Sequence, residues 1–113
     1  MTDKELLELA AKAASYKLVQ GNGIPQERDL YIESFDADGF VSYPHWNPLE
    51  KDGDALRLAV KLQMHMIIGE YIVYVRWMGC SQEIVERATM GYSIEEATRR
   101  AIVRAAAAIG ESM

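Results

Sequence analysis

The sequence predicts an α+β fold in which Ala-rich helices pack on an antiparallel β-sheet, in the order α-β(β)-α-β-β-β-α. Three observations support this prediction. Alanines recur at helical spacing in three segments, two of those segments begin with a capping sequence, and residues 64–89 contain strand-like alternation. With half of its 113 residues apolar, the chain has the size and composition of a single domain, 1–113.

The first helix is predicted over residues 3–14. Thr2 and Glu5 form a T-x-x-E capping box, in which the threonine hydroxyl accepts a hydrogen bond from a backbone amide of the first turn. The apolar stripe at helical spacing consists of Leu6, Leu9, Ala10 and Ala13. Because the alanines make this stripe flat, we expect another element to pack close to it.

Residues 20–29 are polar and contain two glycines and a proline, which predicts a loop. Two β-prone segments follow at 30–35 and 40–43. The Asp-Ala-Asp-Gly sequence between them predicts a hairpin with Gly39 at a positive φ angle. Two prolines then enclose an irregular segment, residues 44–48.

The middle helix is predicted over residues 54–63, with Asp52 or Asp54 capping the free amides of its first turn. Its expected buried stripe is Ala55, Leu58, Ala59 and Leu62. Residues 64–77 contain two strand signals around a Gly-Glu turn, and residues 83–89 alternate as an antiparallel partner strand would.

The last helix is predicted over residues 94–109. Ser93 and Glu96 form a second capping box at its start, and Gly110 is expected to stop the helix at its end. Two i,i+4 ion pairs are expected along it, Glu95–Arg99 and Glu96–Arg100.

Charge and composition argue against several classes of function. The chain has 12 Lys and Arg against 17 Asp and Glu, a net charge of −5, whereas phosphate-backbone binders usually carry a positive surplus. The only cysteine, Cys80, has no partner for an intrachain disulfide. No signal peptide and no apolar run of about 20 residues is visible, which favours the cytoplasm over a membrane.

The segment Trp46-Asn47-Pro48-Leu49, followed by residues 52–58, resembles the signature of the phage ABA sandwich domain family. In that family a Trp-Asn-Pro turn precedes a helix, and an earlier helix and a final Ala-rich helix flank the strands. The resemblance implies a phage or prophage origin and an α-β-α layered fold, and it brings no established activity. Residues 20–29 depart from the family as a longer insert.

A second likeness concerns the end of the chain. Residues 91–97, Gly-Tyr-Ser-Ile-Glu-Glu-Ala, follow the predicted strands and open an Ala-rich helix. This order is similar to the end of double-stranded-RNA-binding domains and of HicB-type antitoxins. The shared pattern is mostly capping chemistry, which any helix on a sheet can use.

The first candidate binding site is the patch formed by Tyr43, His45, Trp46 and Asn47. In the binding interpretation, the indole offers a flat surface for stacking and the amide offers hydrogen bonds. In the structural interpretation, Trp46 fills the edge of the core, Asn47 bonds to the backbone, and Pro48 fixes the start of the helix. Both interpretations fit the sequence.

The second candidate site is a basic strip on the last helix, formed by Arg99, Arg100 and Arg104. Together with other arginines these side chains could hold a phosphate-bearing ligand. The alternative is a solvated helix face that Glu95 and Glu96 neutralise.

No metal or other cofactor is predicted. His45, His65 and Cys80 lack the spacing of metal ligands, and Cys80 has no base near it in the sequence. Residues 36–39 begin like a calcium loop but lack its later ligands, and residues 21–23 lack the third glycine of a dinucleotide site.

The leading functional hypothesis is a phage or prophage accessory protein of the host cytoplasm. It would act as a non-enzymatic binding module for a host or phage protein or a small ligand. The alternatives are a nucleic-acid-binding protein that uses the basic strip, which the net charge disfavours, and an enzyme with an unrecognised site. We expect no membrane partner, and an unpaired sheet edge would allow a homodimer.

Overall fold

The structure, a computed structural model, describes residues 1–20, 30–89 and 91–113. In these residues the chain forms three helices, α1 (Asp3–Ala13), α2 (Asp52–Lys61) and α3 (Ile94–Glu111). The strands in the same ranges are β1 (Leu18–Gln20), β2 (Leu30–Ile32), β3 (Ser34–Phe35), β4 (Val41–Ser42), β5 (His65–Ile68), β6 (Ile72–Arg76) and β7 (Ile84–Arg87). All strand pairs are antiparallel, so the predicted α+β class is confirmed.

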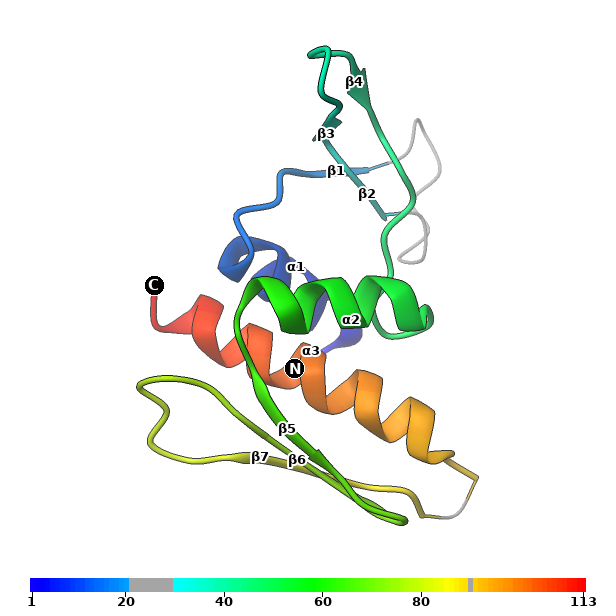
Figure 1. Ribbon diagram of the computed structural model, residues 1–113, viewed down its shortest axis with the longest axis vertical. Coiled ribbons are helices and arrows are strands. Elements are labelled where there is room, and N and C mark those ends of the chain that lie inside the picture. Colours follow the sequence, from blue (N-terminus) through cyan, green and yellow to red (C-terminus); the bar gives the residue numbers. More distant parts are fainter. Residues whose placement is uncertain (21–29, 90) are drawn as a thin grey trace.

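Helix α3 runs through the middle of the molecule (Figure 1). It contacts α1 and α2 on one side and the sheet β5-β6-β7 on the other. The small sheets β1-β2 and β3-β4 lie beyond α1 and α2, at the opposite end from β5–β7 (Figure 1). The helices are therefore the inner layer, and the α-β-α order that the family resemblance implies is not the order of these layers.

The core has two clusters, one on each side of α3. The larger cluster joins the three helices to Leu30 and Trp46, and the smaller one sets Val73 and Val75 of β6 against the alanines of α3. Gly110 lies where α3 packs against α1, since a Cβ at this position would collide with the backbone carbonyl of Leu9. The prediction that Gly110 stops the last helix is therefore wrong, because α3 continues to Glu111.

Local signals set the starts of α1 and α3. The hydroxyl of Thr2 accepts from the amide of Glu5 at 3.2 Å, and that of Ser93 accepts from the amide of Glu96 at 3.1 Å, as the capping sequences predict. The start of α2 is different. Its N-cap is Lys51 without a side-chain cap, so the prediction that Asp52 or Asp54 caps this helix is wrong.

The hairpin predicted around Gly39 is present. Gly39 has a φ angle of 86°, and the carboxylate of Asp36 accepts from the amides of Asp38 and Phe40, both at 2.9 Å. Strand β1, which pairs with β2, was not predicted. The loop predicted at 20–29 lies outside the described residues, apart from Gln20 at the end of β1.

The sheet β5-β6-β7 has one covered and one open face. Strand alternation and register place Met66, Ile68, Val73, Val75, Ile84 and Glu86 on the side of α3. The opposite side, the outer sheet face, consists of His65, Ile67, Ile72, Tyr74, Arg76, Val85 and Arg87. Strands β5 and β7 are the two edges of this sheet.

Candidate functional site

Trp46 and Asn47 form the turn before α2. Trp46 is only 2% exposed and meets the ring of Tyr16 edge to face at 5.8 Å. The backbone amide of buried Asn47 donates to the Asp54 carboxylate at 3.0 Å. The side-chain oxygen of Asn47 accepts from the backbone amide of Leu49 at 3.0 Å. Buried Asp54 also binds Arg57 at 2.7 Å. This geometry matches the structural interpretation of the turn, and the binding role of the two side chains stays a prediction.

Tyr43 and His45 lie just before this turn and are less buried. Tyr43 is exposed, whereas His45 is half-buried, meets the Tyr31 ring at 5.4 Å and pairs with it in an isolated bridge. Tyr43 is therefore the one member of the predicted patch whose side chain is mostly open to solvent.

The three arginines of the basic strip join α3 to its neighbours. Arg99 binds Asp52 at 2.6 Å and donates to the carbonyl of Leu49 at 2.9 Å. Arg100 lies 3.4 Å from Asp3 and 3.9 Å from Glu86. Arg104 binds Glu86 at 2.7 Å and the carbonyl of Val85 at 3.2 Å.

These partners differ from the expected ones. No ion pair in the described part of the chain joins Glu95 to Arg99 or Glu96 to Arg100, so that expectation is wrong. The acids of α1, α2 and β7 neutralise the strip instead, because the arginines reach across to those elements. Phosphate binding by Arg99, Arg100 and Arg104 stays a prediction, and a phosphate would have to displace these carboxylates.

The histidines and the cysteine lie apart. Cys80 lines a polar hollow with Glu83 and Arg76, but neither histidine lines that hollow, so it lacks the histidine base typical of a cysteine nucleophile. His65 lines a different hollow beside Trp77. Within residues 1–20, 30–89 and 91–113, no cluster of His, Cys, Asp and Glu is arranged to hold a metal ion.

An apolar groove of about 300 Å³ lies between α2, β5 and α3. The residues that α3 contributes to the lining are called the floor of the groove, and those of α2 and β5 are called its walls. The apolar residues that line it are Ala55, Leu56, Met66, Ile68, Ile94 and Ile102. Thr98 lies among them, and Asp52, Glu95 and Arg99 complete the lining.

The groove exists because α3 lies under β6 and β7, so that the inner side of β5 extends beyond the helix. Two apolar side chains are left open there. Leu56 of α2 is 58% exposed and Ile68 of β5 is 54% exposed, although both lie beside buried residues of the core. Such a pair of apolar walls around an open floor is typical of a binding groove.

The free edge of β5, next to this groove, presents backbone hydrogen-bonding groups. The amide of Gly69 donates to the carbonyl of Ile72 at 2.8 Å, which makes these residues a hydrogen-bonded pair. Hydrogen-bonded and non-hydrogen-bonded pairs alternate along an antiparallel ladder, so the backbones of His65 and Ile67 bond to β6. The N–H and C=O groups of Met66 and Ile68 then point toward the free edge. The free edge of β5 therefore offers two donors and two acceptors beside the groove.

Sequence reasoning missed this groove, although part of its signal was present. Leu56 lies outside the predicted buried stripe of the middle helix, and Ile67-Ile68 places apolar residues on both faces of one strand. Neither feature shows that the two elements would lie side by side. That proximity comes from the way both contact α3.

Comparison with known protein families, curated proteins and solved structures gives no match for this chain. The likeness to phage ABA sandwich proteins therefore stays a prediction. No helix in the described ranges is long and apolar enough to cross a membrane.

Proposed function

We propose that this protein is a non-enzymatic binding module that holds an extended segment of a partner protein in the groove beside β5. The observation that carries the proposal is the free edge of β5 next to an open apolar floor. An added strand would bond to Met66 and Ile68 through its backbone, and its alternate side chains would enter the groove.

The chemistry of the groove supports a peptide rather than a polar metabolite. Its lining is mostly aliphatic, and its charged rim residues Asp52 and Arg99 already bind each other. Its volume is at the small end of the range for ligand sites, which suits a few apolar side chains. A partner segment with apolar residues at every second position fits both the floor and the edge.

The basic strip supports a nucleic-acid function less well, because each arginine has an acidic partner. A phage or prophage setting, with a host or phage protein as the partner, is kept in the proposal on the sequence resemblance alone. The turn at Trp46 then has a supporting role, since it fixes the start of α2 and so the wall that contains Leu56.

A selection from a displayed library of random peptides tests the proposal. We expect the selected peptides to share apolar residues at every second position. A synthetic copy should lose at least about tenfold in affinity for the Leu56→Asp and Ile68→Asp variants, because a carboxylate in an apolar contact is costly to desolvate. Isothermal titration calorimetry measures the dissociation constants.

Val60→Asp is the matched control, since Val60 is 68% exposed on the same helix and does not line the groove. It should bind the peptide as the wild type does. Trp46→Ala is an unsuitable variant for this purpose, because it would open a cavity in the core. Equal affinity for wild type, Leu56→Asp and Ile68→Asp would refute the proposed site.

A further inference from the structure

A second apolar surface lies at the opposite end of the molecule from the sheet β5–β7. The hairpin of residues 33–43, here called the arm, projects beyond the helices (Figure 1). Register places Phe35 opposite Val41, and Tyr43 follows on the same side. All three side chains are exposed, with Phe35 at 64%. A two-stranded ribbon without a covered face is marginally stable alone, so this side of the arm is suited to a partner.

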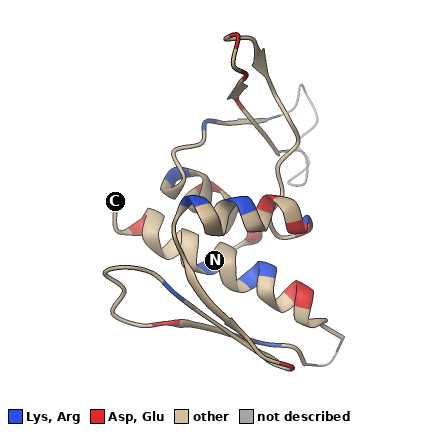
Figure 2. Ribbon diagram, viewed as in Figure 1, with Lys and Arg blue, Asp and Glu red and all other residues tan. Residues whose placement is uncertain are grey.

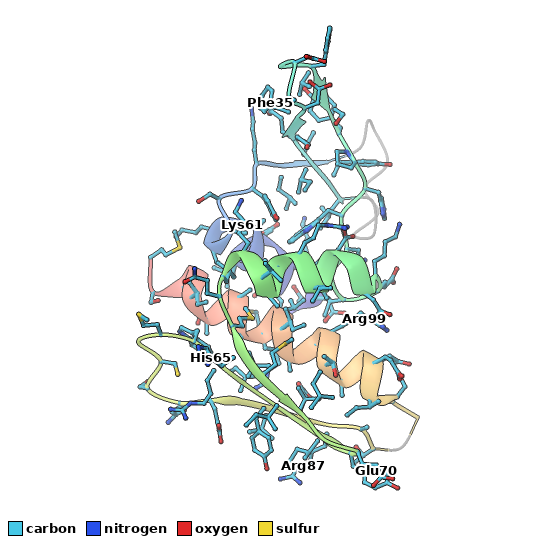
Figure 3. All side chains as sticks on the ribbon, in the orientation of Figure 1. Phe35, Lys61, His65, Glu70, Arg87 and Arg99 are labelled. Atoms are coloured by element: carbon cyan, nitrogen blue, oxygen red, sulfur yellow. The ribbon has the colours of Figure 1, made fainter. Side chains whose placement is uncertain are left out.

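The outer sheet face is another uncovered apolar surface. Ile67 at its edge is 68% exposed, and Ile72, Tyr74 and Val85 form a half-buried apolar patch beside it. Arg87 lies on the side of the sheet away from α3 (Figure 3). A sheet face of this composition is usually covered, because antiparallel sheets that face water carry polar side chains there.

The charges of the two surfaces are opposite. The arm contains Glu33, Asp36 and Asp38 and no basic residue (Figure 2). The outer sheet face contains Arg76 and Arg87, and neither forms an ion pair with any residue that the structure describes. Glu86 of the same strand faces α3, where it binds Arg104. In a chain of net charge −5, this face is thus locally basic.

Arg76 is partly compensated, because it shares a hollow with Glu83. Arg87 is therefore the stronger complement for the arm. Asp38 is the best-placed partner on the arm, since Glu33 already binds Lys17 at 3.2 Å and Asp36 accepts two backbone amides.

We propose that the chain associates head to tail with a second copy of itself, the arm of one copy covering the outer sheet face of the next. The apolar side of the arm, formed by Phe35, Val41 and Tyr43, would lie on the patch formed by Ile67, Ile72, Tyr74 and Val85. Asp38 would approach Arg87 of the neighbouring copy. The two surfaces lie at opposite ends of the longest axis, so one contact leaves an arm and a face free for further copies (Figure 1).

This contact is independent of the proposed groove. Ile67 and Ile68 are neighbours on β5 but point to opposite sides of the sheet, the first to the outer face and the second to the groove. The Ile67→Asp substitution therefore tests self-association, and the Ile68→Asp substitution tests partner binding. Either proposal can fail while the other holds.

Analytical ultracentrifugation over a range of concentrations up to about 1 mM is the first measurement. The average mass of the wild type should rise with concentration and exceed that of a dimer. Phe35→Asp on the arm and Ile67→Asp on the outer face should each weaken self-association at least about tenfold. Phe40→Asp, on the other side of the arm, and Ile68→Asp are matched controls that should associate as the wild type does.

Mixing the two defective variants is the decisive experiment. Phe35→Asp retains an intact sheet face and Ile67→Asp retains an intact arm, so the mixture should form a 1:1 complex and stop there. Formation of this complex also shows that both variants are folded. Charge reversal extends the test, because a mixture of Asp38→Arg and Arg87→Glu should recover assembly beyond the dimer.

Three results would overturn the inference. The first is a wild type that stays monomeric over the whole concentration range. The second is a mixture of Phe35→Asp and Ile67→Asp that stays monomeric, which would mean that the two surfaces do not meet. The third is an equal loss of association in the Phe40→Asp and Ile68→Asp controls.

Discussion

Gly110 determines how closely α3 approaches α1. The backbone of α3 lies against the carbonyl of Leu9 at this point, where a side chain has no space. The sequence suggested a helix stop here, since glycine commonly follows the last helical residue. Glycine also permits close backbone approach, and only the position of the second helix distinguishes the two roles.

Gly110→Ala should lower the free energy of unfolding by about 1–3 kcal/mol, because overpacking against backbone outweighs the better helix propensity of alanine. Urea denaturation with an unchanged m-value measures this. Gly53→Ala is the matched control, since its Cβ would meet only the flexible side chain of Arg57 at 3.4 Å. That variant should be neutral or slightly more stable, and an equal loss in both would contradict the account.

Asp54 holds the turn before α2 in place. It is 6% exposed and accepts from the amide of Asn47 while binding Arg57. The Trp-Asn-Pro sequence indicated either a binding loop or a structural turn, and it did not identify Asp54 as its partner. That contact spans seven residues and depends on how the turn folds back on the helix.

Asp54→Ala should cost about 1–3 kcal/mol of stability, since it leaves a buried amide without an acceptor. Asp52→Ala, two residues earlier, should cost less than about 1 kcal/mol, because that carboxylate is mostly exposed. Thermal unfolding of both variants compares them. If the Asp52 variant were the less stable one, the turn would not depend on Asp54 as described.

Secondary-structure elements with local signals were predicted well. The capping sequences located the starts of α1 and α3, and alternation located β6 and β7. The start of α2 was predicted at residue 54 but lies at Asp52. The first turn of this helix is stabilised by contacts with residues outside the helix, which the local sequence does not reveal. Strand β1 was missed because its three residues carry no pattern of their own and pair with β2, across the 21–29 segment.

Strand β5 should show alternating amide protection in hydrogen exchange, measured by NMR on a dilute sample. The amide of Ile67 should exchange at least about tenfold more slowly than those of Met66 and Ile68, because only Ile67 donates to β6. The amides of β6, a central strand, should all be slow. Uniform protection along β5 would mean that its edge is already covered.

The whole molecule is arranged around α3, whose arginines link it to acids of α1, α2 and β7. This arrangement follows from long-range contacts, and the sequence could only predict helices and a sheet. The groove and the outer sheet face are likewise whole-molecule features. Each depends on which parts of the sheet α3 leaves uncovered.

Because each basic-strip arginine has an acidic partner in a chain of net charge −5, we expect no salt-dependent binding to duplex RNA or DNA. Electrophoretic mobility shift at low salt is the measurement. A shift that weakens steeply with salt and disappears in an Arg100→Gln, Arg104→Gln double variant would favour the nucleic-acid alternative instead.

The most direct test of the account follows the amides of Met66 and Ile68 by NMR while a library-selected peptide is added. If an extended segment pairs with the free edge of β5, these two amides should become protected from exchange, and the amide of Ile67 should stay as protected as before. Peptide binding that leaves both edge amides unprotected would place the ligand elsewhere and contradict the proposed groove.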